Sequence, residues 1–536
     1  MVTSARPSAI PEGSAPPFLG ATPAQLARLR TAFRDANLTF AELFRRTSEE
    51  DEAEREGAPA PDHLGDVCNV LRRLLVAGRP TARDVVHERL PADLVRVLDE
   101  LGLLLDAPQG PDLLISPALL CPLAGLWLWC DNPGLTPGHM LPDVVYSPLT
   151  PNTQQFMLML PRTPCDAVLE LCGGTGVAAL ASARLARTAV TADITERSTA
   201  FAAFNARFNE IANVESVCGD LYDPVRGRTF DRIVAHPPYM PNFEQEYVFR
   251  DGGADGEQIT RRVIAGLPGA LREGGRFFCM CLATDRRDAP LEQRVRGWLG
   301  SDEADFDVFV TELQSPRDPT EFYARRAYDN LGSFADVDAR HRFFKQAGIE
   351  RLVYGAIALQ RRRRPRPTFT ARRKKGPFTA GVHLEWAMDW ETRNLDAGFP
   401  AHVEQLAPKP SPELRMRLTY APRHDGFALI DSTLEVASPL AYEVETPPWV
   451  PQFVERCADG RRTVREQHAA LVRDAVIPDD VPVERFAVAV RDLAATGVLV
   501  LPGYEPPPPV EASVAVLDEW PPLERDALAR EADGVG

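Results

Sequence analysis

The spacing of apolar residues changes along the chain. From residue 166 onward, short runs of β-branched and other apolar residues alternate with stretches of helical periodicity. This alternation is typical of a mostly parallel sheet with helices on both faces. The pattern predicts seven strands, at residues 166–172, 189–194, 215–218, 231–236, 276–282, 305–310 and 351–359. We therefore expect an α/β fold with a seven-stranded, Rossmann-like core.

The residues before this core have mainly helical periodicity. A helix is predicted to begin after the capping residue Thr22, and residues 64–105 read as helix, turn, helix and strand. We therefore predict a helical, winged-helix-like N-terminal domain over residues 21–145. Its candidate recognition helix, residues 93–100, carries three acids against Arg96 alone, so packing or partner docking is favoured over DNA binding.

The two ends of the chain and the region after the core have their own composition. Residues 1–20 are rich in Pro, Ser, Gly and Ala, which predicts a disordered tail. Residues 361–375 hold nine Arg or Lys and no acid, and the prolines among them favour a basic linker over 361–376. An RNA contact through Arg361–Lys375 is the alternative. An α+β C-terminal domain is expected over 377–536, winged-helix-like near 450–502.

Composition narrows the class of protein. A chain of 536 residues is too long for one core, and its formal charge of -16 argues against a protein that coats nucleic acid. The nine cysteines include no C-x-x-C pair, so no metal site is expected. The N-terminus lacks the apolar middle of a signal peptide, and proline and glycine interrupt the uncharged run 113–130. We therefore expect a cytoplasmic protein with no membrane partner.

The sharpest motif is the glycine-rich sequence VLELCGGTG at residues 168–176, where an apolar strand runs into a turn and a helix. Glycine lets a ligand approach bare backbone there, and the helix N-terminus presents free N–H groups. The motif alone also fits the dinucleotide fingerprint, since Asp193 follows at the distance of a ribose-binding acid. Both interpretations predict an adenosine site.

Two further features separate these interpretations. Asp193 ends the second strand and Asp220 follows the third, so two carboxylates are expected at adjacent strand ends. The fourth strand ends in His236-Pro-Pro-Tyr239, for which a dehydrogenase has no use. Paired prolines fix an extended backbone, so carbonyls can point into a cleft beside an aromatic face. Such a corner can accept hydrogen bonds from a planar nitrogen and stack on its plane.

In this order, the motifs resemble the small methyltransferase group of class I S-adenosylmethionine-dependent methyltransferases. That group includes release-factor glutamine methyltransferases and N-methyltransferases of ribosomal and transfer RNA bases. Asn205-Ala-Arg-Phe-Asn209 and Asp251-Gly-Gly-Ala-Asp-Gly-Glu257 also match. The whole layout is similar to poorly characterised bacterial multidomain proteins. The resemblance covers about residues 146–360 and implies S-adenosyl-L-methionine as cofactor, without a metal.

The resemblance implies roles for individual residues. The methionine part of the cofactor would be lined by Glu170, Cys172, Gly173, Gly174 and Gly176. Its ribose would meet Asp193 beside Ile194, its adenine Asp220 and Leu221, and the catalytic corner would be His236, Pro237, Pro238 and Tyr239. The chain departs from the family twice: Cys172 replaces a glycine, which is tolerable at a negative φ, and His236 replaces Asn or Asp.

The expected reaction is methyl transfer to an amide or base nitrogen of a protein, peptide or RNA substrate. The alternatives are a tailoring methyltransferase of a natural-product or peptide pathway and a non-catalytic cofactor-binding regulator. Residues 249–257 are interpreted as a substrate-side flap. Asn205 and Asn209 are expected to be helix-surface or packing residues and not ligands. Phe201, Phe204 and Phe208 are expected to lie in the core because they recur at helical spacing.

Overall fold

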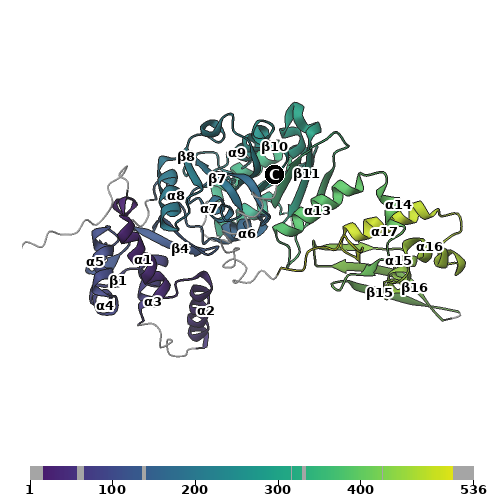
Figure 1. Ribbon diagram of the computed structural model, residues 1–536, viewed down its shortest axis with the longest axis horizontal. Coiled ribbons are helices and arrows are strands. Elements are labelled where there is room, and N and C mark those ends of the chain that lie inside the picture. The colour runs from purple at the N-terminus through teal and green to yellow at the C-terminus, as the bar shows by residue number, and fades with distance from the viewer. Residues whose placement is uncertain are drawn as a thin grey trace, which may run out of the picture. The chain divides into compact units, whose positions relative to one another are not determined.

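The computed structural model divides the chain into two compact units. It describes residues 16–56, 66–135, 140–314, 317–328, 334–424 and 426–510. Among these, the first unit comprises residues up to Leu158 together with Pro164–Arg272. The second comprises Met159–Thr163 and the residues from Glu273 on. Figure 1 labels the elements along the chain.

The first unit contains four parallel strands, in the order β9-β6-β7-β8. Their bounds are β6 Cys165–Leu171, β7 Ala186–Asp193, β8 Val214–Cys218 and β9 Phe230–Ala235. The helices that follow them are α7 Val177–Ser182, α8 Glu196–Phe208 and α9 Gln258–Ala270. Helix α8 packs on β7 and β8 (Figure 1). Because the strands are parallel, the loops after their carboxyl ends converge on one edge.

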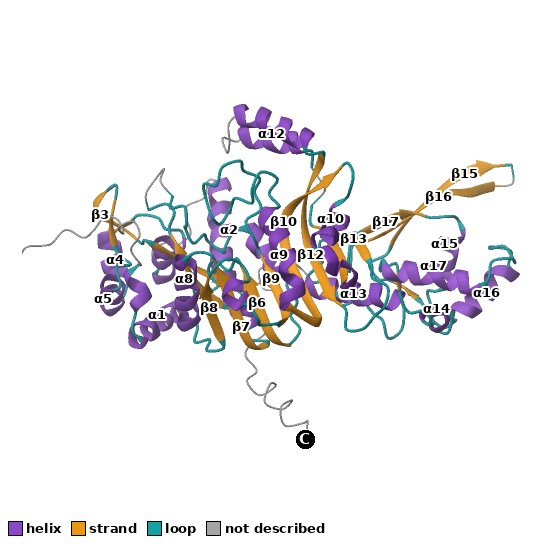
Figure 2. Ribbon diagram, turned by 90° about the horizontal axis from the view of Figure 1, so that it is seen from above, coloured by secondary structure: helices purple, strands orange, loops and turns teal. Residues whose placement is uncertain are grey.

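The remaining strands of the mixed sheet are largely antiparallel (Figure 2). They are β10 Leu271–Arg286, β11 Phe306–Glu312, β12 Ile349–Arg361 and β13 Thr370–Lys374, accompanied by α10 Leu291–Trp298, α11 Pro319–Tyr328 and α12 Phe334–Gln346. The order of all eight strands is β13-β11-β12-β10-β9-β6-β7-β8. All seven predicted strands are present. The expected seven-stranded sheet is therefore corrected to eight strands.

The eighth strand, β13, lies within the segment predicted to be a basic linker and pairs with β11 in parallel. Its arginines are neutralised inside the second unit. Arg372 pairs with Asp285, Glu292 and Glu312, and nearby Arg366 pairs with the fully buried Asp307. The basic composition therefore complements acids elsewhere in the same unit.

The N-terminal residues of the first unit form mainly short helices. Helix α1, Pro23–Asp35, begins at a capping box in which Thr22 accepts from Gln25, as the sequence predicted. The elements that follow are α2 Phe40–Glu56, α3 Val67–Leu71 with a π-turn at Arg72–Val76, β1 Thr81–Ala82, α4 Arg83–Arg89, α5 Ala92–Glu100, β2 Leu105–Ala107 and β3 Gly110–Ile115. The three strands form an antiparallel sheet in the order β1-β3-β2.

A hairpin of β4 Ala118–Leu123 and β5 Leu126–Asp131 packs against α8. The buried aromatic cluster at this contact consists of Phe18, Phe33, Trp129, Phe201, Phe204 and Phe208. The three phenylalanines of α8 are thus core residues, as expected. In the described part of the chain, no helix is long and apolar enough to cross a membrane.

The segment expected to be a disordered tail, residues 1–20, overlaps the described residues only at its end. Residues 1–15 of the expected disordered segment lie outside the described residues. Pro17–Gly20 form a 3-10 turn whose Phe18 is buried against Trp129. The ordered chain therefore begins before residue 20.

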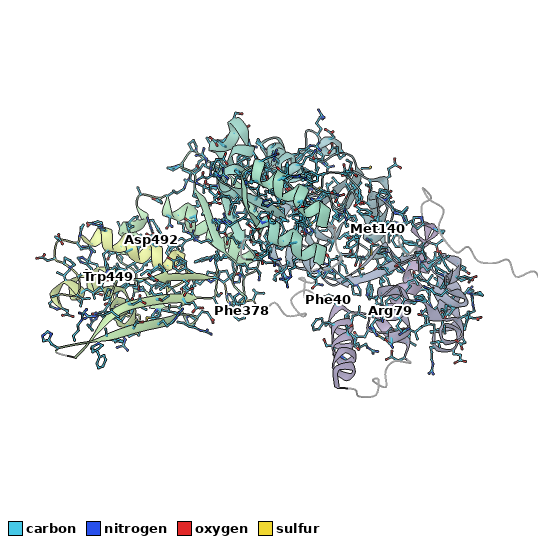
Figure 3. All side chains as sticks on the ribbon, turned by 180° about the vertical axis from the view of Figure 1, so that it is seen from behind. Phe40, Arg79, Met140, Phe378, Trp449 and Asp492 are labelled. Atoms are coloured by element: carbon cyan, nitrogen blue, oxygen red, sulfur yellow. The ribbon has the colours of Figure 1, made fainter. Side chains whose placement is uncertain are left out.

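The C-terminal residues of the second unit begin with α13 Gly381–Asn394 and α14 Phe399–Val403. The rest are β14 Lys409–Pro410, β15 Arg415–Arg423, β16 Gly426–Val436, β17 Tyr442–Glu445, α15 Trp449–Arg456, α16 Val464–Arg473, α17 Val483–Ala495 and β18 Leu499–Val500. Trp449, labelled in Figure 3, packs on Phe453 and Phe486 and so joins α15 to α17.

Candidate active site

The glycine-rich turn after β6 is held by a buried carboxylate. Glu170 is 3% exposed, and its two oxygens accept from the backbone N–H groups of Ala178 and Ala179, each at 3.0 Å. Burial raises the pKa of this carboxyl to about 7, against the lowering effect of those hydrogen bonds. Both oxygens therefore bind the first turn of α7, and Glu170 shapes the loop from beneath.

The loop backbone needs left-handed conformations. Gly174 has φ +54° and Gly176 φ +78°. Cys172 also has φ +57°, so the condition under which cysteine would be tolerable there, a negative φ, is not met. A Cβ on Gly173 would collide with Thr191 Oγ1, whereas one on Gly174 would meet no atom within 4 Å. The loop is therefore closely packed against Thr191 at Gly173, whereas the space beside Gly174 is open.

Asp193, at the end of β7, accepts hydrogen bonds on both carboxylate oxygens. Oδ2 accepts from Gly174 N at 2.9 Å, and Oδ1 accepts from Thr195 N at 3.0 Å and Thr195 Oγ1 at 3.2 Å. Thr195 in turn caps α8. Ile194 beside it is 56% exposed. Asp193 thus ties the glycine loop to the start of α8 at the edge where a nucleoside would lie.

Asp220 follows β8 and forms an ion pair with Arg262 of α9 at 2.7 Å. Hydrogen bonding to Asp220 raises the pKa of Arg262. Leu221, next in sequence, has φ +50°. Arg262 was not foreseen from the sequence, because it lies 42 residues from its partner and belongs to no motif.

Asn205 of α8 braces the glycine loop from the opposite side. Its Nδ2 donates to the Thr175 carbonyl at 3.0 Å and to the Trp129 carbonyl at 3.1 Å. Its Oδ1 accepts from Trp129 N, and Asn209 bridges Trp127 in the same way. Both asparagines are packing residues, as expected, and Asn205 also couples hairpin β4–β5 to the loop.

His236 follows β9 and is packed between two rings. Its imidazole stacks on Phe156, with centroids 5.1 Å apart and planes 25° apart, and lies 5.6 Å from Tyr239. Nε2 is buried and has no hydrogen-bond partner among the described residues. Burial lowers the pKa of His236 to about 4, so the imidazole is neutral near pH 7.

The helix before the core, α6 Pro151–Met159, supplies contacts that the sequence did not reveal. Phe156 stacks on His236, and Asn152 Nδ2 donates to Tyr239 Oη at 2.7 Å. In the sequence, the apolar run that starts at Phe156 predicts that this helix is buried, but it does not indicate which residues the helix contacts. Helix α6 therefore fixes two rings of the expected catalytic corner.

Residues 249–257, interpreted from sequence as a flap, are hydrogen-bonded to the segment that follows the His-Pro-Pro-Tyr corner. Met240 N donates to the Arg250 carbonyl and Gly252 N to the Met240 carbonyl, both at 2.9 Å. A Cβ on Gly252 would lie 2.7 Å from the Pro238 carbonyl oxygen, and one on Gly256 would collide with the carbonyl of Tyr239. The glycines allow close backbone contact, so this segment backs the corner.

The strand register brings the two motifs together. Leu171 of β6 pairs with Ala235 of β9, so Cys172 and His236 leave adjacent strands side by side. Leu171 also pairs with Ala192 of β7, one residue before Asp193. The glycine loop, Asp193 and the His-Pro-Pro-Tyr corner therefore share one edge of the sheet.

Comparison with known proteins agrees with this geometry. Residues 146–297 match the family model of the methyltransferase small domain. A putative protein N5-glutamine methyltransferase from Methanocaldococcus jannaschii is 37% identical over 115 residues, which are 20% of this chain and 57% of that protein. The ribosomal protein uL3 glutamine methyltransferase of Bradyrhizobium diazoefficiens is 25% identical over 202 residues, 35% of this chain and 63% of that protein.

Among solved structures, the ribosomal protein L11 methylase of Lactobacillus delbrueckii subsp. bulgaricus is similar at a TM-score of 0.24 and 18% identity, over 39% of this chain and 79% of that chain. The chain spans about three fifths of the length of the two curated relatives above. The resemblance seen in the motifs is confirmed, and with it S-adenosyl-L-methionine as the expected cofactor. Residues 146–297 are the part of this chain that is similar to the methyltransferase small domain.

Proposed function

We propose that the protein transfers a methyl group from S-adenosyl-L-methionine to the side-chain amide nitrogen of a glutamine in a protein substrate. The observation that carries the proposal is His236, whose buried Nε2 is unpartnered among the described residues beside Tyr239 and the glycine loop. The names of the relatives support an amide target over an RNA base.

The residues of the loop fit the cofactor. The open space above Gly174 leaves room for a ligand against bare backbone. Asp193 and Asp220 stand at adjacent strand ends, where they would take the ribose and the adenine, with Ile194 and Leu221 beside them. When bound, S-adenosyl-L-methionine supplies an electrophilic methyl group on a sulfonium.

Glu170 has a different part in this site. Because Glu170 is only 3% exposed and both of its oxygens accept from α7, we infer that it positions Cys172–Gly176 and does not contact the cofactor itself. This interpretation replaces the direct role that the resemblance implied for it.

The catalytic corner would act by orienting the amide. An amide nitrogen holds its lone pair in resonance, so it reacts when its N–H groups are held by acceptors that favour pyramidalisation. The neutral imidazole of His236 and the carbonyl of Pro237 would be these acceptors, while Pro238 fixes the backbone and Tyr239 forms the stacking wall. Alignment of nucleophile and methyl carbon then supplies much of the rate.

We infer that the end domains select the substrate and that the protein works in the cytoplasm. Support comes from the element order: residues 67–115 alternate helices with three short strands, and residues 449–500 form three helices followed by one short strand. Helix α5 is occupied on one side by α1, where Arg28 pairs with Asp93 and Gln25 Nε2 donates to Glu100. This contact favours packing over base reading for α5.

A label-transfer experiment tests the proposed function. The protein is incubated with methyl-labelled cofactor and size-fractionated lysate, and each fraction is divided for RNase and protease treatment. We expect the macromolecular label to survive RNase and to be lost to protease. Label that RNase removes would instead assign the activity to RNA.

A further inference from the structure

Exposed aromatic side chains lie beside the catalytic corner. Tyr146 is 42% exposed and stacks on Phe249, with centroids 4.6 Å apart and planes 8° apart. Phe243 is 49% exposed. Asn242 N donates to the Gly253 carbonyl at 2.9 Å, so Phe243 and Phe249 belong to one loop whose two ends meet. Scattered exposed apolar residues are normal in proteins, but aromatic side chains on one loop favour a contact surface. We name Tyr146, Phe243 and Phe249 the aromatic rim.

Backbone hydrogen bonds place this rim next to the site. Met240, which follows Tyr239, donates its N–H to the Arg250 carbonyl at 2.9 Å. Val248 N donates to the Pro142 carbonyl at 3.0 Å. This hydrogen bond joins the segment between β5 and α6, which carries Tyr146, to the residue before Phe249. Figure 3 labels Met140 at the start of that described segment. The rim therefore adjoins the segment that carries Tyr239.

The loop that carries Phe243 and Phe249 is acidic. Residues 239–257 contain five Asp or Glu, of which Glu244 and Glu246 are exposed while Asp251 and Glu257 are buried, and a single base, Arg250. Arg250 is already paired with Glu246 and Asp251. Glu244 is exposed and, among the described residues, has no ion-pair partner. The surface therefore offers a carboxylate beside exposed rings.

The same loop already binds one cationic side chain, that of Arg250. The Arg250 guanidinium lies 4.6 Å from the centroid of the Tyr247 ring while it pairs with Glu246 and Asp251. Cations with apolar stems favour this combination of aromatic face and carboxylate. Tyr146 and Phe243 present aromatic rings at the surface, and Glu244, next to Phe243 in sequence, presents an exposed carboxylate.

We infer that the aromatic rim receives a lysine or arginine side chain of the substrate polypeptide, close in sequence to the methylated glutamine. The inference rests on the proposed function and adds a specificity determinant to it. The aliphatic stem would lie on Tyr146 and Phe243, and the charged head would meet Glu244. A phosphate backbone would be repelled there, which favours a basic polypeptide over RNA.

Three peptides test the inference, identical except that the central glutamine is flanked by lysine, by alanine or by glutamate. Methyl transfer from labelled cofactor gives KM and kcat for each, and fluorescence anisotropy gives the affinity of dye-labelled peptides without turnover. We expect the lysine peptide to have a KM and Kd about fivefold below those of the glutamate peptide at low salt, with the difference shrinking as salt screens it.

Two variants sharpen the test. Glu244→Lys should reverse the preference between the lysine and glutamate peptides, while Glu88→Gln, a charge loss at an exposed position on α4, should leave it unchanged. Equal KM and Kd values for the three peptides would overturn the rim assignment but leave the proposed function standing. Charge-dependent binding without methylation of any peptide would overturn the proposed function and keep the rim.

Discussion

At the scale of single residues, the site departs at Cys172 and His236 from the motifs that the sequence resemblance implies, and the structure gives each departure a physical consequence. Cys172 adopts a left-handed backbone that L side chains rarely take. Burial and the nearby carboxylates Asp193 and Glu170 raise the pKa of its thiol, so it is a poor nucleophile. Cys172 therefore adds backbone strain, and its thiol is not expected to act as a nucleophile.

We predict that Cys172→Gly raises the free energy of unfolding by up to about 1 kcal/mol, because relief of left-handed strain exceeds the entropy cost of glycine. Urea denaturation measures the change. The matched control is Cys218→Gly, which lies in β8 at an ordinary φ and should lose about 1 kcal/mol. Equal losses in both variants would contradict a strained Cys172.

The pKa of His236 predicts that protonation of this residue lowers the activity only at a pH far below neutrality. Because burial holds that pKa at about 4, kcat/KM should be flat with respect to this residue from pH 5.5 to 8. His236→Asn keeps an acceptor and should retain activity, whereas His236→Ala should lose on the order of a hundredfold in kcat. An acid limb near pH 6.5 that disappears in His236→Asn would show an exposed, titrating imidazole.

The same depressed pKa affects folding with a defined sign. Between about pH 6.5 and pH 4, the unfolded chain binds a proton at this histidine that the folded chain does not. The contribution of His236 to stability therefore falls as the pH drops through that range and is constant below it.

At the scale of elements, helix α6 and strand β13 are the parts that the sequence did not reveal. The glycine loop could be predicted because its residues are contiguous and its chemistry is local. Asn152 lies 87 residues from Tyr239, and Arg366 lies 59 residues from Asp307. Such pairs depend on strand order, which residue types and local spacing do not specify. For β13, the run of basic residues was interpreted as a linker, because the acids that pair with it are distant in the sequence.

For α6, we predict that Asn152→Ala lowers kcat about tenfold and leaves cofactor affinity unchanged, because the phenol of Tyr239 loses its donor while the glycine loop is untouched. Gln155→Ala on the same helix is the control. Steady-state kinetics and calorimetry separate the two effects. A weakened cofactor affinity with unchanged kcat would contradict a positioning role for α6 at the corner.

For β13, removal of Arg372 leaves the largely buried acids Asp285, Glu292 and Glu312 without their shared cation. We expect Arg372→Ser to cost about 3 kcal/mol of unfolding free energy. Replacing the exposed Arg363 and Arg364 with Ser should change it by less than about 0.5 kcal/mol. Similar values for both variants in urea denaturation would restore the linker interpretation of this segment.

At the scale of the whole molecule, the net charge of -16 and the internal pairing of the basic segment both argue against binding of nucleic acid. Arg366, Arg372 and Arg373 all pair with acids of their own unit. We therefore predict no salt-sensitive binding of single-stranded RNA at about 10 μM protein. Filter binding at two salt concentrations tests this. Tight binding that the Arg363 and Arg364 serine variant loses would return the segment to a nucleic-acid role.

The central claim concerns the atom that receives the methyl group, and tandem mass spectrometry of a methylated peptide tests it most directly. A glutamine peptide is incubated with the protein and labelled cofactor, beside peptides in which asparagine or lysine replaces the glutamine. We predict one methyl group on the glutamine side-chain nitrogen, and about a hundredfold less product from the His236→Ala variant at matched time. A methyl group found on the lysine peptide, or on the glutamine peptide outside its side chain, would contradict the account.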